Sequence, residues 1–490
     1  MKNMQAGNLF VCGFNGLKVN DEIKYLIHEK QIAGVILFRR NIESREQLKA
    51  LTNALQQEAK LAGYTNPLLI SIDEECGTVS RLSGLLTPFP GAMLLGATGD
   101  KQIVEKVYEA LGTELLELGV NWNLAPIADV QNNELNPVIG VRSFGENPSE
   151  VGDYVGSAVT GLQKVGAIAT LKHFPGHGDT SVDSHLSLPV IEHDEDRLEA
   201  IELVPFVKGI EAQAECVMAA HIHFPQFDAD QIPASISNKV INGLLRSKLG
   251  FKGAVITDCM EMQAIKQSFG TEKACVMGVQ AGVDFLLVSH TFETQKSSIK
   301  AVEQAIATGE ITEQQFTTAY ERVQKVIKHV GKVQPRTFDH TAISKQAFDK
   351  GVTVIREQEV HFDGSLNIVV LGEAVKTIAE DVVSTNSVLK QSLQNRSYQI
   401  LTFEQALQAE GSLIVITQNA TDSSMQQKQI QQLEAYQKSF VLIATKKPYD
   451  AKLTSKMAVC TFEPSVEALA AAFRIICDSQ KSHGVLPVTI

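Results

Sequence analysis

The first two thirds of the chain alternate short apolar runs with amphipathic helical segments, and no other feature of the sequence restricts the fold as strongly. Such alternation is typical of parallel strands joined by crossover helices. The runs expected to form strands are 9–12, 34–38, 68–72, 120–124, 167–173, 216–221, 254–257 and 284–288. Eight β-α units predict a TIM (β/α)8 barrel, for which ~250 residues is typical and insertions are common.

A doubly wound sheet is the alternative fold for this pattern. That fold usually places a phosphate-binding glycine loop after its first strand and gathers its polar strand ends at a switch point. The sequence has no such loop, and polar residues close several of its apolar runs instead. Both observations favour the barrel.

The last third of the chain predicts a second, smaller domain. The polar stretch 331–337, which contains a proline, indicates a linker. Beyond it, strands are expected at 366–371, 398–401, 412–417, 440–445 and 457–460, with helices such as 465–477. This pattern predicts a three-layer α/β/α sandwich. The expected division is a barrel domain at 1–333, a linker at 334–360 and the sandwich domain at 361–490.

Charge and cysteine content limit the partners of the protein. The 490 residues include 44 Lys plus Arg and 56 Asp plus Glu, and the net charge of −12 argues against a nucleic-acid or membrane partner. The seven cysteines are scattered without a C-x-x-C pair, so neither a disulfide framework nor a zinc site is indicated. The start of the chain lacks the apolar run of a secretory signal. We therefore expect a cytoplasmic protein that binds a neutral small molecule, and the oligomeric state stays open.

Polar side chains gather where the predicted barrel strands end, which is where barrel enzymes carry their chemistry. Asp73 follows the third strand, Lys172 and His173 end the fifth, and Asp258 follows the seventh. The loop 172–185 holds three His, one Lys and two Asp within fourteen residues. That density of titratable groups favours a functional site over an ordinary polar surface loop.

Three of these residues fit glycosyl transfer. Asp183 and His185 lie two apart, so the carboxylate can accept a hydrogen bond from the imidazole and make it a general acid/base. Asp258 stands where a barrel presents a nucleophile, and its alternative role is a helix N-cap for the segment that follows. An aspartate at a strand end together with an imidazole acid/base fits double displacement at an anomeric carbon.

Four segments also carry a resemblance to a known family. They are Ile72-Asp73-Glu74-Glu75-Cys76-Gly77 with Arg81 following, 136–145, 172–185 and Ile256-Thr257-Asp258. They resemble motifs of glycoside hydrolase family 3, in its β-N-acetylhexosaminidase branch. The run Lys-His-Phe-Pro-Gly-His-Gly with Asp-Ser-His after it is highly specific, and 447–450 and 484–488 resemble the second domain of the same family.

The resemblance implies a role for each matching residue. Asp258 would be the nucleophile, and His185, oriented by Asp183, would be the acid/base. Five further residues would bind the terminal sugar: Asp73, Arg81, Arg142, Lys172 and His173. Carboxylates accept hydrogen bonds from sugar hydroxyls, whereas Lys and Arg donate to them and keep a nearby nucleophile ionised. No cofactor and no metal is implied.

One residue departs from the family pattern. Cys76 stands where the family usually has the first of two glycines, and a Cβ there is expected to crowd a turn near the sugar and to disfavour positive φ. Because Asp183 and His185, the proposed acid/base pair, already belong to the first domain, the second domain need not supply a catalytic group. Glu373 and Glu467 of the second domain are therefore expected at the surface.

Three other features are expected to be structural. His221 and His223 alternate along a strand as two metal ligands do, but no set of further ligands completes a site. Trp122 is expected in the core. Cys259 adjoins Asp258 without a neighbouring cation in the sequence, so a catalytic thiol is not expected.

The expected activity is that of a retaining exo-β-N-acetylglucosaminidase acting on small GlcNAc-terminated glycosides, including cell-wall fragments. Two alternatives are enzymes of the same family, a β-N-acetylglucosaminide phosphorylase and a β-glucosidase. A neutral histidine acid/base does not repel phosphate as a carboxylate does, which keeps the phosphorylase open. The non-enzymatic alternative is a sugar-binding sensor.

Overall fold

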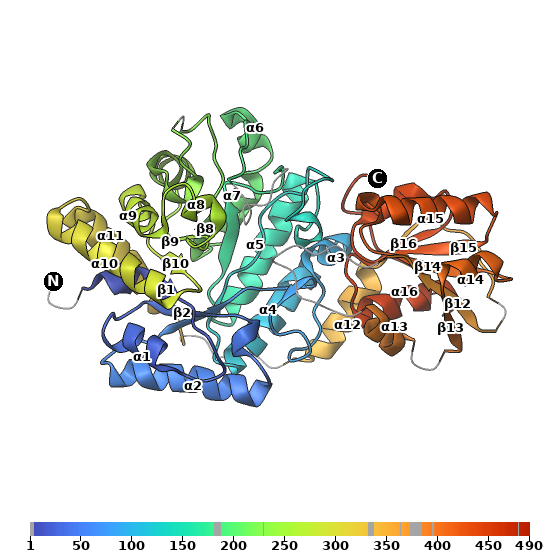
Figure 1. The fold of residues 1–490 in the computed structure, drawn as a ribbon, viewed down its shortest axis with the longest axis horizontal. Helices are drawn as coiled ribbons and strands as arrows, with labels where there is room; N and C mark the ends of the chain where they lie inside the picture. Colours follow the sequence, from blue (N-terminus) through green and yellow to red (C-terminus); the bar gives the residue numbers. More distant parts are fainter. Residues whose placement is uncertain are drawn as a thin grey trace.

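A closed barrel of eight parallel strands forms the first domain (Figure 1). The computed structural model describes residues 4–180, 188–228, 230–331, 338–362, 364–372, 385–393, 396–478 and 480–490. The barrel strands are β1 (Phe10–Cys12), β2 (Gly34–Leu37), β3 (Leu69–Ile72), β6 (Trp122–Asn123), β7 (Thr170–Phe174), β8 (Cys216–Ala219), β9 (Ala254–Thr257) and β10 (Leu286–Val288). Each overlaps a predicted run.

Two ladders and the bridges between them close the barrel. The strand orders are β10-β1-β2-β3-β6 and β7-β8-β9, and all of these pairs are parallel. Parallel bridges join Trp122 to Ile168 and Ile256 to Phe285, so no barrel edge remains open at these points. The predicted TIM barrel is confirmed, and the doubly wound alternative is wrong.

Amphipathic helices surround the barrel because each buries one apolar stripe against the strands. In α2, Ser44 accepts a hydrogen bond from the backbone N–H of Gln47, and Leu48, Leu51 and Leu55 are buried on one face. The outer helices are α1 (Asp21–His28), α2 (Arg45–Leu61), α4 (Lys101–Glu117), α5 (Pro148–Lys164), α7 (Val204–Glu211), η5 (Lys239–Lys248), α9 (Thr271–Ala281), α10 (Phe292–Thr308) and α11 (Glu313–Ile327).

A small antiparallel hairpin follows β3 and brings polar residues to the mouth of the barrel. Its strands are β4 (Glu74–Cys76) and β5 (Val79–Ser80). Cys76, the last residue of β4, and Gly77, the first residue of the turn after it, have positive φ of 63° and 57°. The buried carboxyl of Glu74 closes the hairpin by accepting hydrogen bonds from the backbone N–H groups of Cys76 and Leu82.

The second domain is a six-stranded sheet between helical layers (Figure 1). The strands, in sheet order, are β11 (Thr353–Ile355), β16 (Ala458–Cys460), β15 (Phe440–Ala444), β14 (Leu413–Thr417), β12 (Leu366–Val370) and β13 (Tyr398–Leu401). The helices are α12 (His340–Gly351), α13 (Thr385–Ser392), α14 (Phe403–Gln408), α15 (Ser424–Ala435) and α16 (Val466–Asp478). The predicted α/β/α sandwich is confirmed.

The range 334–360, expected to be a linker, contains helix α12 and strand β11. Strand β11 runs antiparallel to β16 and is thereby part of the second sheet. It is only three residues long and has no amphipathic helix before the next strand, so the β-α pattern did not mark it.

The two domains pack through short helix α3 (Ala92–Ala97), which follows the hairpin. Met93, Leu94 and Ala97 are buried in the apolar core of the second domain rather than that of the barrel. The carboxyl of Glu463 accepts a hydrogen bond of 2.6 Å from the backbone N–H of Gly91, just before α3. The hairpin and α3 therefore connect the mouth of the barrel to the second domain.

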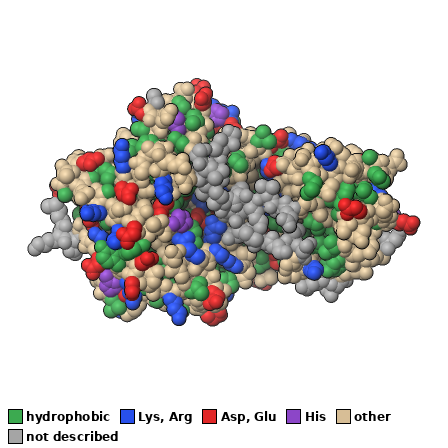
Figure 2. Space-filling model, in the orientation of Figure 1, with side chains coloured by type: hydrophobic (Ala, Val, Ile, Leu, Met, Phe, Trp, Pro, Cys, Tyr) green, Lys and Arg blue, Asp and Glu red, His purple; other side chains and the backbone are tan. Residues whose placement is uncertain are grey.

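Acidic and basic side chains are intermingled over both domains on the face shown in Figure 2. Among the described residues, no helix combines the length and apolar character needed to cross a bilayer.

Candidate active site

A cavity of about 420 Å³ opens at the carboxyl ends of the barrel strands. Its walls come from residues that end or follow β2, β3, β7, β9 and β10, as expected for a barrel enzyme. All described residues with a predicted site role line it: Asp73, Arg81, Arg142, Lys172, His173 and Asp258. Asp183 and His185 lie outside the described residues.

Four charged side chains form a buried cluster on one wall of this cavity. Lys172 Nζ lies 2.8 Å from Asp73 Oδ1 and 2.7 Å from Glu75 Oε1. Arg142 makes a bidentate pair with Glu75, with Nε to Oε2 and Nη2 to Oε1 both at 2.8 Å. Glu75, Arg142 and Lys172 are all buried, whereas Asp73 is partly exposed to the cavity. Asp73 is thus the more accessible carboxylate of the cluster, and Glu75 fixes the two cations, which also line the cavity.

Charge pairing keeps this cluster ionised. Burial disfavours the charged form of Glu75, but the positive charges of Arg142 and Lys172 outweigh it and hold the pKa of Glu75 well below its ordinary value. Burial likewise opposes the charge of Lys172, yet Asp73 and Glu75 raise its pKa. At neutral pH the wall therefore presents fixed donors and acceptors to a polyhydroxylated ligand.

A buried carboxylate orients the histidines of the loop after β7. Asp129 accepts hydrogen bonds from His173 Nδ1 at 2.8 Å, from the His173 backbone N–H at 3.2 Å and from the His177 backbone N–H at 2.7 Å. Because a carboxylate only accepts, Nδ1 of His173 carries the hydrogen, and Nε2 is the ring nitrogen that can serve a ligand. Asp129 therefore sets both the tautomer and the orientation of His173.

We expect the free energy of unfolding to fall as the pH is lowered from 6.5 to 4, in part because His177 is held neutral. Burial, and after it the charge of His173, lowers the pKa of His177 to about 4 from 6.5. The unfolded chain takes up this proton at higher pH than the folded protein, so the folded state loses about 3 kcal/mol across that window. Urea unfolding at several pH values should show a shallower loss in His177→Gln. An equal pH slope in both proteins would contradict the assignment.

Asp258 emerges directly from β9 into the cavity. Its backbone N–H donates to the carbonyl of Ala219 in β8 at 3.0 Å, and its Oδ1 accepts from the backbone N–H of Cys259 at 2.7 Å. The next helix, α8 (Gln263–Lys266), has Met262 at its N-cap. The alternative reading of Asp258 as a helix N-cap is therefore wrong.

His221 braces the turn that carries Asp258. Its Nε2 donates to the carbonyl of Cys259 at 2.9 Å, and its Nδ1 accepts from the hydroxyl of Ser235 at 2.7 Å. Both ring nitrogens are thus committed to hydrogen bonds, which is a structural role rather than that of a metal ligand. Burial raises the pKa of the Cys259 thiol to about 11, so this thiol stays protonated.

Three residues considered in the sequence analysis do not line the candidate active site. Trp122 is fully buried, where its indole N–H donates to Thr170 Oγ1 at 2.7 Å, as expected for a core residue. Cys76 keeps its positive φ, and its side chain lines a different cavity, between the domains, so it does not crowd the sugar site as expected. Glu467, expected at the surface, is half-buried in that same cavity, and Glu373 lies outside the described residues.

Sequence reasoning missed Glu75, Asp129 and His177 as parts of the site. The position of Glu75, two residues after Asp73, was a usable signal because alternate residues of an extended segment face the same way. Asp129 follows the apolar run of the fourth strand, but its partners lie 44 and 48 residues away. Only the closed barrel brings them together.

Residues 2–326 match the model of the glycosyl hydrolase family 3 N terminal domain. The chain belongs to glycoside hydrolase family 3. The family predicted from the four motifs is therefore confirmed, and the candidate site lies within the matched residues.

The family 3 chain is similar to several β-hexosaminidases. Beta-hexosaminidase A of Pseudoalteromonas piscicida is 38% identical over 327 residues, which are 62% of this chain and 54% of that protein. The chain thus matches about half the length of this relative. Beta-hexosaminidase of Stenotrophomonas maltophilia (strain K279a) is 33% identical over 288 residues, 58% of this chain and 83% of that protein.

A solved structure extends the similarity to the second domain. The family 3 beta-N-acetylglucosaminidase from Paenibacillus sp. str. FPU-7 superposes with a TM-score of 0.92 at 34% identity. The superposition covers 99% of this chain and 98% of that one. Both domains, and their relative placement, are therefore shared with that protein.

Proposed function

We propose that the protein is a retaining exo-β-N-acetylglucosaminidase that releases terminal β-linked GlcNAc from small glycosides, including cell-wall fragments. The observation that carries the proposal is that Asp258 shares one cavity with the Asp73–Lys172 ion pair. A carboxylate beside fixed donors and acceptors can attack a sugar that those groups hold in place. The similar β-hexosaminidases support the same substrate class.

In the proposed reaction Asp258 attacks the anomeric carbon and forms a glycosyl ester. His185, oriented by Asp183, gives a proton to the departing oxygen and then takes one from the incoming water. The sugar hydroxyls bind Asp73, Arg81, Arg142, Lys172 and His173. The cations among these also favour the ionised form of Asp258.

Chain length supports the proposed part of His185. Thr180 is the last described residue before His185 in the sequence. Its hydroxyl lies 2.8 Å from Nδ1 of His177, and His177 lines the cavity. His185 is the fifth residue after Thr180. An extended chain spans ~3.4 Å per residue, so His185 can reach ~17 Å from Thr180.

Aryl β-GlcNAc and aryl β-glucoside substrates test the specificity. We expect the GlcNAc substrate to be hydrolysed with a kcat/KM at least about 100-fold higher, since a site built around a polar substituent rejects an analogue without it. Proton NMR of the first product should show the β-anomer. A preference for the glucoside would instead identify a β-glucosidase, and GlcNAc binding without cleavage would identify a sugar-binding sensor.

Phosphorolysis is the second candidate, because four arginines line the same cavity: Arg39, Arg40, Arg81 and Arg142. Guanidinium groups bind phosphate readily. Comparing the products formed in phosphate buffer with those formed in a phosphate-free buffer of equal ionic strength distinguishes hydrolysis from phosphorolysis. We expect free GlcNAc in both buffers, whereas GlcNAc-1-phosphate as the main product in phosphate would identify a phosphorylase.

A further inference from the structure

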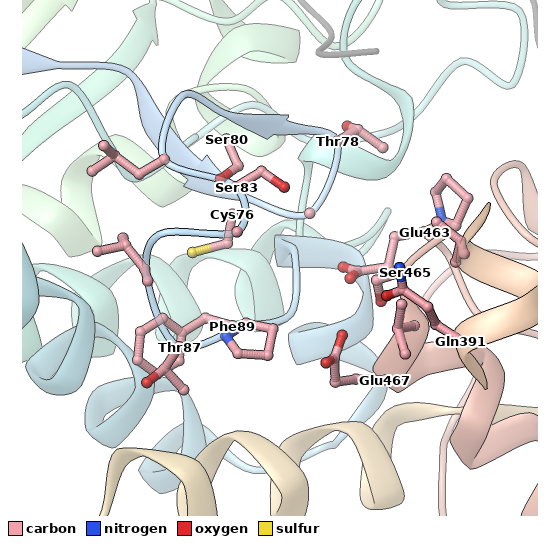
Figure 3. Close-up of a pocket in the computed structure, with 18 of the residues that line it drawn as sticks. Cys76, Thr78, Ser80, Ser83, Thr87, Phe89, Gln391, Glu463, Ser465 and Glu467 are labelled. Atoms are coloured by element: carbon pink, nitrogen blue, oxygen red, sulfur yellow. The ribbon is translucent and has the colours of Figure 1, made fainter. Parts of the chain in front are cut away.

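A second cavity, larger than the one beside Asp258, lies between the two domains (Figure 3). Its volume is about 640 Å³, against about 420 Å³ for the candidate active site. Small-molecule sites typically enclose ~300–1,000 Å³. The volume of the interdomain cavity therefore lies within the range for a small-molecule site, and it is about one and a half times that of the active-site cavity.

Both domains supply polar groups to this interdomain cavity. Figure 3 shows the carboxyl groups of Glu463 and Glu467 directed into it from the second domain, with Gln391 beside them. Thr78 and Ser80 of the hairpin and the ring of Phe89 line the barrel side. Carboxyl, amide and hydroxyl groups next to an aromatic ring are the groups that recognise the hydroxyls and the apolar faces of a sugar.

The two carboxyl groups favour a ligand rich in hydrogen-bond donors. Burial raises the pKa of Glu463 to about 7, and the nearby Glu467 adds to this effect. Burial also raises the pKa of Glu467. Two carboxyl groups in a poorly hydrated space repel each other when both are ionised. Hydroxyl or amide N–H donors placed between them compensate for that repulsion.

The hairpin is a wall shared by the two cavities. Asp73, Glu75, Val79 and Arg81 line the active-site cavity, whereas Glu74, Cys76, Thr78 and Ser80 line the interdomain cavity. This division follows from the alternation of side chains along a strand, with the turn at Cys76 and Gly77 between its arms. A ligand in the interdomain cavity therefore contacts the face of the hairpin opposite to the one that carries Glu75, the partner of Lys172 and Arg142.

We propose that the interdomain cavity is a second saccharide site that takes a β-1,4-linked GlcNAc disaccharide. The size of the cavity fits two sugar rings. The carboxyl groups of Glu463 and Glu467 accept from its hydroxyl and acetamido N–H groups, and Phe89 lies against an apolar ring face. The identity of the sugar rests on the proposed function, because the same class of saccharide is its substrate.

Titration calorimetry with a thio-linked GlcNAc disaccharide tests the second site. The sulfur in place of the bridging oxygen prevents cleavage, so binding alone is measured. We expect two sites per chain in the wild-type protein and one in Glu467→Leu. The matched control, Glu404→Leu, replaces an exposed glutamate of the same domain and should keep two sites. Turnover of aryl β-GlcNAc by Glu467→Leu should stay within about twofold of wild type, which also shows that the variant is folded.

The outcomes separate this inference from the proposed function. One site in a wild-type protein that turns over aryl β-GlcNAc overturns the second site and leaves the activity intact. Two sites that persist in Glu467→Leu place the second sugar elsewhere and equally overturn it. No binding together with no turnover contradicts the proposed function, and the second site is then wrong as well.

Discussion

Replacing Asp258 by alanine is expected to lower kcat for an aryl β-GlcNAc substrate by about 10⁴-fold or more, the range seen when a nucleophile is deleted. The reason is that three described carboxylates line the cavity, and the proposed reaction assigns the attack on the anomeric carbon to Asp258. Asp73 and Glu75 are the others, and both are paired with Lys172. The KM should change far less, because Asp258 is not among the groups proposed to hold the hydroxyls.

The same variant allows a rescue experiment. Azide is a small anionic nucleophile that can occupy the space left by the carboxylate and attack the sugar directly. We expect azide to restore part of the turnover of Asp258→Ala and to give the α-glycosyl azide. Asp153→Ala, which removes an exposed aspartate of α5, is the matched control and should retain wild-type turnover. Wild-type turnover in Asp258→Ala would remove this residue from the mechanism.

Replacing Glu75 by glutamine should lower the free energy of unfolding by about 3–5 kcal/mol, the usual cost of removing one partner of a buried ion pair. The substitution keeps the shape of the side chain but leaves Arg142 without its bidentate carboxylate, and leaves Lys172 with Asp73 alone. Since Lys172 and Arg142 then lose their fixed orientation, the KM for aryl β-GlcNAc should also rise. Urea unfolding and steady-state kinetics measure the two effects.

A surface pair provides the comparison for this variant. Glu105 lies 3.1 Å from Lys164, and both side chains are more than a third exposed. Glu105→Gln should change the unfolding free energy by less than about 1 kcal/mol. If Glu75→Gln were as stable as Glu105→Gln, the buried cluster would not be ionised as described.

Much of the barrel could be predicted because its signal is local. Each parallel strand is buried on both faces and therefore reads as an apolar run, and each helix carries its own apolar stripe. The short strand β11 lies at the edge of its sheet, and two of its three residues are only partly buried. It pairs with β16 from more than 100 residues away, and this pairing is a property of the assembled sheet.

The residues of the candidate site also differ in how well the sequence alone predicts them. Asp73, Lys172, His173 and Asp258 could be found because each stands at the end of an apolar run. The importance of Glu75 could not be predicted, because the two cations that it pairs with, Lys172 and Arg142, come from β7 and from the segment before α5. The direction of the Cys76 side chain could not be predicted either. It depends on the hairpin that separates the two cavities, and the interdomain cavity forms only when both domains are in place.

The most direct test of the account is to trap the glycosyl-enzyme. A fluorinated GlcNAc glycoside with a good leaving group forms the covalent ester faster than water breaks it, and peptide mass spectrometry then locates the sugar. We expect a single label, on Asp258. A label on any other side chain, or no label while the enzyme is being inactivated, would contradict it.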